Sequence, residues 1–377
     1  MNTPRVISFR LSLSFLIIIL FIISLGIFWN VQANDSQYTL IELNTIPAQS
    51  NSQIVDVQVN DNILFVLDAF HGLTTYDISD PTQPTQLGHF SDMNTFVHSI
   101  LIVDKYAYLS DYDDGLEIID ISDPMNLKII GRYQPDISAS SIDAYFSNDL
   151  VFLASQSRGL EILNCSNPSN PIFIGTYYEG HRVIRAYSVG NLVFISEAFN
   201  GFKILNIADG VCNEIYHFID SVSYQCFYVQ NDLLYTTDKE FGVHVFNISD
   251  LSNIVKIGEY NTGTTYGFFL EKKDQKTLLY VTTWEKGLVI FDISDPKNID
   301  FLIQYNDGDG GEAYNVAVRD ELVFVAEFKA GLEILRFLPS EDASSTTSSR
   351  TTFISSFELI LIVFFTIFFR QRLYDKN

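Results

Sequence analysis

Three observations predict that this 377-residue chain folds as an all-β, seven-bladed propeller of four-stranded blades. A glycine followed by a large apolar residue recurs seven times at intervals of 41 to 45 residues, the length that four short strands and their turns require. The same order of apolar runs and polar turns surrounds each recurrence. Aromatic residues make up 14% of the chain, which favours strands. The seven pairs are Gly72-Leu73, Gly115-Leu116, Gly159-Leu160, Gly201-Phe202, Gly242-Val243, Gly287-Leu288 and Gly331-Leu332.

Each unit begins with two apolar strands. The first, exemplified by residues 99–103, ends at a short polar turn such as Asn148-Asp149. The second is a compact apolar run such as Val323-Phe324-Val325-Ala326. A polar hairpin ending in glycine follows, because a tight hairpin often requires a positive φ.

The third strand is represented by Gly115–Pro124, and the fourth by Ile129–Tyr133. The Asp-Ile-Ser-Asp-Pro ending stops the third strand, because proline has no N–H for the ladder and Asp or Ser can cap a turn. The predicted units lie near residues 51–90, 95–133, 139–178, 182–218, 222–260, 264–305 and 312–337.

The last unit lacks a fourth strand. Residues 38–44 alternate apolar and polar side chains and precede the first complete unit. We therefore expect them to complete the last blade, so that the ring closes without an exposed pair of strand edges.

These strands resemble the LVIVD repeat family, whose units pair a YVAD-like strand with the pattern GLxIVDISDPxxPxxVGxY. The resemblance covers residues 50–337 and departs from the pattern at Asn206–Gly210 and at Asp250-Leu251, where the proline stop is missing. It implies a β-propeller of the prokaryotic cell surface and does not imply one activity.

Two apolar runs flank the predicted propeller of residues 34–339. Residues 1–33 carry basic residues before an apolar run, which is typical of either a cleaved signal peptide or a retained signal-anchor. Residues 353–370 are predicted to be a transmembrane helix, after a Ser/Thr-rich stalk at 340–352 and before a basic cytoplasmic tail at 371–377. We thus expect a cell-membrane protein, single-pass if the signal is cleaved, with its propeller outside the cytoplasm.

The predicted exterior part is strongly acidic. The whole chain has a net charge of −23; residues 34–349 hold 17 basic and 44 acidic residues, a net charge of −27. Such a surface argues against binding nucleic acid or anionic lipid. Cys165, Cys212 and Cys226 match no zinc or redox spacing; buried free thiols are one interpretation and a bridge between Cys212 and Cys226 is the other.

Acidic residues cluster in the predicted hairpins between second and third strands, which share one face of a propeller. They indicate either a charged rim that attracts a cation or a basic partner, or solvated turn carboxylates. The residues are Asp68, Asp111, Asp113, Asp114, Glu197, Asp238, Glu240, Glu285 and Glu327.

Two further groups are candidate ligands. Asp307, Asp309 and Glu312 lie on a glycine-rich loop and fit either calcium, which needs several oxygen ligands, or an ordinary Gly/Asp turn. Four residues are expected near the opening of the central channel, where they either bind an anion or are scattered polar groups: His98, His181, Arg182 and Arg185.

No catalytic motif such as a nucleophile elbow, a Walker loop or HExxH occurs in the chain. The function we expect is therefore a cell-surface binding, adhesion or protein-interaction module for a surface protein, a glycan or a cation. The alternative is an extracytoplasmic hydrolase or oxidoreductase with a metal or cofactor in the channel, using the rim carboxylates as ligands. Elemental analysis distinguishes the two, since a stoichiometric transition metal would favour the enzyme.

Overall fold

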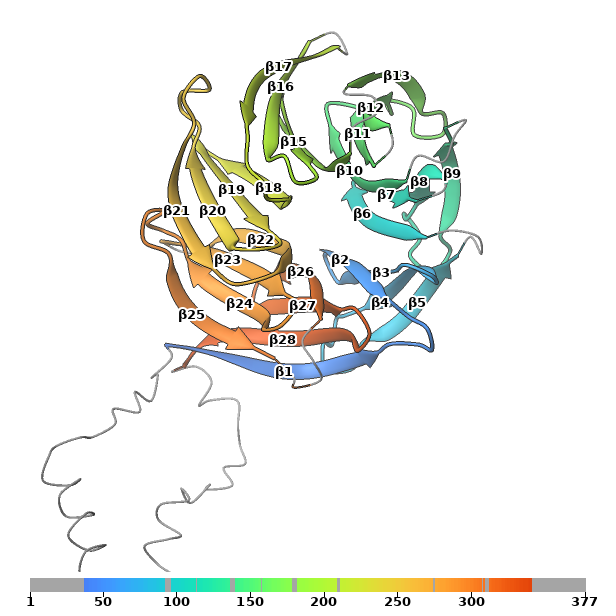
Figure 1. The fold of residues 1–377 in the computed structure, drawn as a ribbon. Coiled ribbons are helices and arrows are strands. Elements are labelled where there is room, and N and C mark those ends of the chain that lie inside the picture. The colour runs from blue at the N-terminus through green and yellow to red at the C-terminus, as the bar shows by residue number, and fades with distance from the viewer. Residues whose placement is uncertain are drawn as a thin grey trace, which may run out of the picture. The chain divides into compact units, whose positions relative to one another are not determined.

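A computed structural model describes residues 37–340 apart from 92–95, 113, 136–139, 157, 178–181, 209–210, 274, 307 and 309–311. Residues Tyr38–Asn377 form one compact unit, and Met1–Gln37 form another that lies almost wholly outside the described residues. The described part of Tyr38–Asn377 contains seven four-stranded antiparallel sheets arranged around a centre (Figure 1). The predicted all-β, seven-bladed propeller is confirmed.

Each blade runs from a first strand at the centre to a fourth at the outside. The first strands are β2 (Ile54–Asn60), β6 (Val97–Val103), β10 (Ser141–Ser147), β14 (Val183–Val189), β18 (Tyr224–Gln230), β22 (Thr265–Lys273) and β26 (Ala313–Arg319). The second strands are β3 (Ile63–Asp68), β7 (Tyr106–Asp111), β11 (Leu150–Ser155), β15 (Leu192–Glu197), β19 (Leu233–Asp238), β23 (Lys276–Thr283) and β27 (Leu322–Glu327). The third strands are β4 (Gly72–Asp77), β8 (Gly115–Asp120), β12 (Gly159–Asn164), β16 (Phe202–Ala208), β20 (Gly242–Asn247), β24 (Gly287–Asp292) and β28 (Gly331–Pro339). The fourth strands are β5 (Thr85–Phe90), β9 (Lys128–Tyr133), β13 (Ile172–Tyr177), β17 (Val211–Phe218), β21 (Val255–Asn261), β25 (Asp300–Tyr305) and, in the last blade, β1 (Tyr38–Pro47).

The N-terminal strand closes the ring as expected. β1 pairs antiparallel with β28 from Tyr38 opposite Pro339 to Pro47 opposite Gly331, so it is three residues longer than predicted. The Tyr38 ring also stacks on Phe337, with ring centroids 5.0 Å apart. Strands from both ends of the described chain thus complete one blade, and β28 has no open edge.

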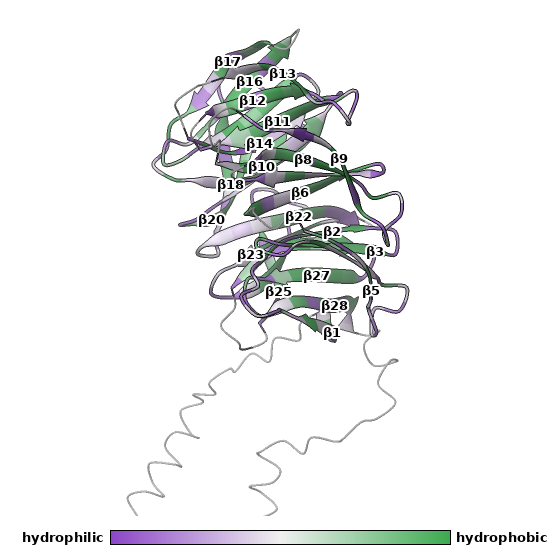
Figure 2. Ribbon diagram, turned by 90° about the vertical axis from the view of Figure 1, so that its right-hand side faces the viewer, coloured by the Kyte–Doolittle hydropathy of each residue, from purple (hydrophilic) through white to green (hydrophobic). Residues whose placement is uncertain are grey.

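The hydrophobic core lies between neighbouring blades. Between the last and first blades, for example, Phe324 and Ile334 pack in one buried cluster with Ile54 and Leu64. Figure 2 shows the consequence, with predominantly apolar strands and hydrophilic turns. Because each apolar layer needs side chains from two blades, no blade can bury its faces alone.

The hairpin glycines meet the expected backbone requirement. All seven have a positive φ, a conformation that L-residues with a Cβ adopt rarely. There is a second reason at Gly331, where an added Cβ would lie 2.1 Å from the carbonyl oxygen of Ile46. The glycine therefore serves both the turn and the close approach of the outer strand.

A second set of glycines brings neighbouring blades together. A Cβ added to Gly88 would lie 2.3 Å from the carbonyl oxygen of Pro124, and one added to Gly131 would lie 2.1 Å from that of Pro168. Both prolines belong to the third-strand stop of the following blade. Gly175 has nothing within 4 Å, and the blade after it lacks the proline stop. The glycine of the fourth strand thus leaves the space that the proline carbonyl of the next blade occupies.

Within the described residues, no helix is long and apolar enough to cross a membrane. The predicted segments at 1–33 and 353–370, the tail at 371–377 and all of the stalk except Ser340 lie outside those residues.

Candidate functional site in the central channel

A β-bulge near the start of every first strand places one residue of each blade in a ring around the centre. In blade one the pairing passes from Ile54 opposite Asp68 to Asp56 opposite Leu67, so that Val55 is left unpaired, and the other six blades shift in the same way. The residue after the bulge lines the same central cavity in every blade. These ring residues are Asp56, Ser99, Asp143, Arg185, Cys226, Gly267 and Asn315.

The cavity has a volume of about 250 Å³. Four tyrosines also line the cavity: Tyr145 and Tyr187 lie two positions after ring residues, and Tyr266 and Tyr314 lie immediately before ring residues. The rings of Tyr266 and Tyr314 stack with their centroids 4.8 Å apart. The cavity thus combines aromatic side chains with six different residue types at seven equivalent backbone positions.

Asp56 links three blades. Its carboxylate accepts hydrogen bonds from the backbone N–H groups of Val57 at 2.8 Å and Ile100 at 2.9 Å, and from the Asn315 side-chain amide at 2.5 Å. Burial raises the pKa of Asp56 to about 7, although the bonds from Ile100 and Val57 favour the charged form. This group therefore changes charge near neutral pH while it holds the ring together.

Arg185 and Asp143 give the ring a cation beside an anion. Asp143 accepts a 3.1 Å hydrogen bond from the N–H of Ala186, and burial raises its pKa, partly opposed by the charge of Arg185. Burial is the largest single influence and lowers the pKa of Arg185, but the charges of Asp143, Cys226, Tyr314 and Asp56 together outweigh it, and the net shift is upward. Arg185 is thus a permanently charged group inside the channel.

Aromatic and cationic groups surround this cavity on the side of the hairpins between second and third strands. Trp284 and Phe328 pack together with ring centroids 5.8 Å apart, and Trp284 also contacts Tyr266. The Lys239 ammonium lies 4.9 Å from the centre of the Tyr266 ring. We call the side chains of Tyr112, Lys239, Trp284 and Phe328, which follow the second strands of their blades, the channel mouth.

The family comparison can now be set against this geometry. The LVIVD repeat model matches five segments, at residues 53–92, 97–135, 138–179, 278–307 and 310–335. Five of the seven blades contain LVIVD repeats. The unmatched stretch contains blades four and five of the LVIVD propeller, where the sequence departs from the proline stop.

Solved structures share the fold at low identity. Raptor from Chaetomium thermophilum has a TM-score of 0.65 at 12% identity, covering 80% of this chain and 29% of that one. The extracellular domain of BT4673 from B. thetaiotaomicron has a TM-score of 0.57 at 12% identity, with 78% and 39% covered. The computationally designed Ika8 protein has a TM-score of 0.56 at 11% identity, with 78% and 99% covered. No curated protein matches the sequence.

The LVIVD propeller brings only part of the predicted channel group together. His98 and Arg185 line the cavity, whereas Arg182 is exposed and donates a 2.7 Å hydrogen bond to Gln156. His181 lies outside the described residues. His98 contacts Phe96 edge to face, and burial, together with the charges of Arg185 and Lys239, lowers its pKa to about 4. At neutral pH His98 therefore adds no charge to the cavity.

Five of the predicted rim carboxylates are buried, so the interpretation of these five as solvated turn groups is wrong. Asp68 and Asp111 accept hydrogen bonds from backbone N–H groups of their own hairpins, and both are the last residue of a second strand. Ser155 and Thr283 occupy the same place in two other blades and also accept a turn N–H. The five buried carboxylates are Asp68, Asp111, Glu197, Asp238 and Glu327.

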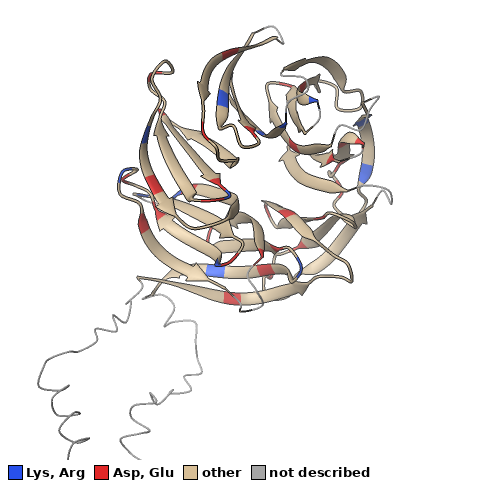
Figure 3. Cartoon of the chain, in the orientation of Figure 1, with Lys and Arg blue, Asp and Glu red and all other residues tan. Residues whose placement is uncertain are grey.

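The remaining rim residues are more accessible. Glu240 and Glu285 are exposed, Asp114 is half-buried, and Asp113 lies outside the described residues. A rim that attracts a cation or a basic partner therefore stays a prediction, and it concerns these positions. Figure 3 shows that acidic positions outnumber basic ones around the ring.

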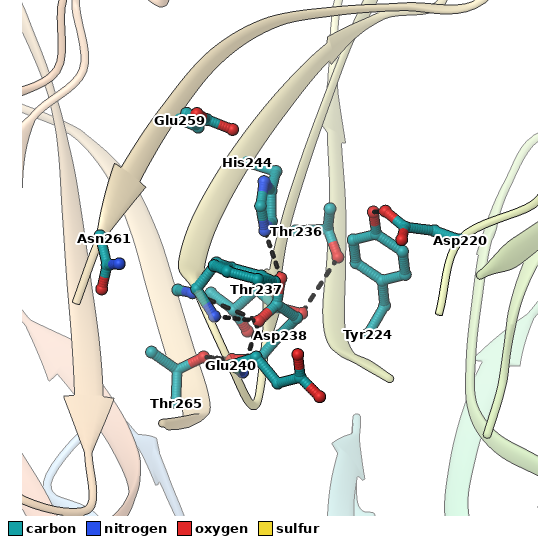
Figure 4. A network of polar contacts seen from close by, with 12 residues as sticks. Asp220, Tyr224, Thr236, Thr237, Asp238, Glu240, His244, Glu259, Asn261 and Thr265 are labelled. Atoms are coloured by element: carbon teal, nitrogen blue, oxygen red, sulfur yellow. Dashed lines mark hydrogen bonds and ion pairs between the residues drawn. The ribbon is translucent and has the colours of Figure 1, made fainter. Parts of the chain in front are cut away.

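Asp238 illustrates how such a carboxylate is held (Figure 4). One oxygen accepts the backbone N–H groups of Glu240 and Phe241, each at 2.6 Å, and the other contacts Nε2 of the buried His244. Burial alone would raise the pKa of Asp238, but the bonds from His244 and the turn outweigh it and lower the pKa. The network braces the hairpin that carries Lys239 to the channel mouth.

Of the three residues predicted to bind calcium, the structure describes only Glu312, because Asp307 and Asp309 lie outside the described residues. Glu312 Oε1 lies 3.1 Å from the Lys329 ammonium, and Oε2 is buried with no hydrogen-bond partner in the described structure. Among the described residues, no group of three or more His, Cys, Asp or Glu side chains is arranged to hold a metal.

Sequence reasoning missed most of the ring. Asp143 and Asn315 were not singled out, nor were Tyr266 and Lys239. A signal for the ring exists, because its residue lies sixteen positions before the hairpin glycine in six blades, as from Asp56 to Gly72. The three cysteines are free, as one of the two interpretations expected, but only Cys165 is buried, whereas Cys212 and Cys226 are half-buried. Cys226 occupies a ring position.

Proposed function

We propose that the LVIVD propeller is an extracytoplasmic binding module that takes a surface protein or glycan at its channel mouth. The observation that carries this proposal is the mouth itself, where Trp284 and Phe328 form an aromatic face beside the ammonium of Lys239. Aromatic residues flanked by a few polar groups are typical of binding surfaces. The cavity beneath them gives a ligand a place to insert.

The proposal includes a tether through residues 353–370. Support comes from the propeller's own ends, because Tyr38 and Pro339 are paired residues of β1 and β28. The sequences that precede and follow the propeller therefore join it at the same edge of one blade. A thiol-reactive reagent applied to intact cells tests this: a cysteine introduced at the exposed Glu240 is modified if the propeller is outside, and protection until lysis contradicts the proposal.

Calcium is the cation proposed for the loop from Asn306 to Glu312. Glu312 Oε2, which is buried and has no hydrogen-bond partner among the described residues, supports it, since an oxygen without a donor is available to a hard cation. Titration calorimetry should detect calcium binding that Glu312→Gln weakens by about tenfold. Glu321→Gln, in an exposed turn of the same blade, serves as control, and equal binding by both variants contradicts the site.

The binding function is tested with the purified full chain on arrays of cell-surface glycans and peptides. Trp284→Ala removes the aromatic face of the mouth and should abolish retention on whichever array members the wild type binds. Phe301→Ala is the matched control, because Phe301 is an aromatic residue 40% exposed on the outer strand β25. Loss in both variants, or in neither, places the binding surface elsewhere.

A further inference from the structure

Arg185 has far fewer partners than its chemistry requires. A guanidinium offers five N–H donors, yet among the described residues Arg185 makes a single hydrogen bond, from Nη1 to the carbonyl oxygen of Ile184 at 2.9 Å. The side chain lines the cavity, so its other donors have a space in front of them. Donors of this kind bind a carboxylate well, because the planar fork matches its two oxygens.

The surrounding charges favour a ligand with a single negative charge. Lys239 adds a second cation at the mouth, and burial together with the nearby Arg185 lowers its pKa. Asp143 and Asp56 face the same cavity and oppose the two cations. Burial raises the pKa of both carboxyl groups, so they offset the two cations only in part. A small positive excess suits a monoanion better than a dianion.

The walls add a preference for a ring. Tyr266 and Tyr314 are stacked and line the cavity, and Trp284 and Phe328 extend the aromatic face outward. Sugar and aromatic rings pack on such faces, and the cavity volume of about 250 Å³ admits one ring with its substituent. Neutral His98 and the amide of Gln225 supply further hydrogen-bonding groups on the wall.

We propose that the central channel binds a small ring-bearing monocarboxylate, with Arg185 holding the carboxylate and the Tyr266–Tyr314 wall contacting the ring. This inference rests on the proposed function and names the ligand class for the same mouth. The ring belongs either to an aromatic acid or to an acidic sugar, which share the chemistry that the channel recognises.

The experiment is calorimetric titration of the purified full chain with benzoate and with glucuronate, whose comparison distinguishes the two kinds of ring. Acetate lacks the ring, benzyl alcohol lacks the charge, and inorganic phosphate carries a larger charge. We expect at least one of the two ring acids to bind about tenfold more tightly than all three comparators. Quenching of Trp284 fluorescence is a second readout, because this residue contacts the Tyr266 ring.

Variants locate the site. Arg185→Gln should weaken binding of the ring acid by about tenfold or more, and Lys239→Gln by about threefold. Lys256→Gln should have no effect, because Lys256 is exposed on the outer strand β21, where it pairs with Glu259. If Arg185→Gln does not fold, the exposed Lys239→Gln still decides the question.

The inference is overturned by equal binding of benzyl alcohol and the ring acids, or by unchanged ring-acid binding in the channel variants. Absence of any binding overturns it as well. In each case the proposed function remains separately testable, because the Trp284→Ala and Phe301→Ala comparison on arrays does not depend on a carboxylate. Failure on the arrays with retained, Arg185-dependent benzoate binding would instead leave a small-molecule site and reject the macromolecular partner.

Discussion

The contact between the fourth-strand glycine and the next blade's proline stop makes a quantitative prediction. Gly131 lies in β9, and a Cβ added there would meet the carbonyl oxygen of Pro168 at 2.1 Å. Gly175 occupies the equivalent position one blade later, and a Cβ added there meets nothing within 4 Å. Gly131→Ala and Gly175→Ala thus make the same chemical change, with the blade contact present in only one case.

The expected loss of stability in Gly131→Ala follows from the lack of space for a Cβ. Real Cβ atoms essentially never approach another heavy atom within 3.0 Å, so the turn of Pro168 must move by about an ångström, and a backbone carbonyl cannot rotate away as a side chain would. Overpacking of this kind costs about 1–3 kcal/mol. Replacing glycine by alanine in a strand contributes about 0.5–1 kcal/mol in the opposite direction. Gly131→Ala should therefore be destabilising, and Gly175→Ala neutral or stabilising.

Thermal melting of the full chain, followed by circular dichroism, measures the difference. The gap between the two variants equals the clash, about 1–3 kcal/mol, which corresponds to roughly 2–6 °C in melting temperature for a propeller of this size. Equal melting temperatures would refute the idea that the glycine exists to admit the proline turn. A Gly175→Ala variant less stable than Gly131→Ala would refute it more strongly.

Three further predictions concern the ring and its supports. Burial raises the pKa of Asp56 from 3.8 to about 7, so ionising its carboxyl group opposes folding. The wild type should therefore lose stability relative to Asp56→Asn as the pH rises from about 4 to 7. Urea titrations that show a constant difference in the free energy of unfolding across this pH range would contradict the prediction. Asp238→Asn should lower the free energy of unfolding by about 1–3 kcal/mol by disturbing the bond to His244, whereas the exposed Glu240→Gln should change it little in the same denaturation assay. Deleting residues 38–47 should lower the melting temperature by about 10 °C or more, since β28 loses its partner strand; an unchanged melting curve would contradict the closure.

Most of the fold could be predicted because the signals are local and repeated. Glycine turns, polar stops and alternating strands recur in order, and the order alone limits the blade to four strands. The burial of Asp68 and Asp111 could not be read in this way. A hairpin carboxylate is exposed in an isolated hairpin; it becomes buried only when a neighbouring blade covers the turn, which depends on packing between distant residues.

The candidate site was harder to predict, because its members share a position and not a residue type. His98 and Arg185 are recognisable in the sequence as candidate anion ligands near a strand start, but Asp56 and Asn315 resemble any polar residue of a strand. What unites the ring is the β-bulge, a backbone feature that leaves one residue unpaired and turns the next toward the centre. Aligning units on the hairpin glycine would have found six of the seven positions.

The division between repeated and varied positions indicates where specificity lies. Positions that recur, such as the hairpin glycine, serve the blade and are interchangeable among units. The seven ring positions are equivalent in backbone geometry, yet six residue types occupy them, and Asp alone occurs twice. Blades four and five, which the LVIVD model does not match, supply Arg185 and Lys239. The cationic side of the channel thus comes from the units that depart most from the repeat. This is expected if ligand binding, and not only the propeller fold, determines the sequences of these two blades.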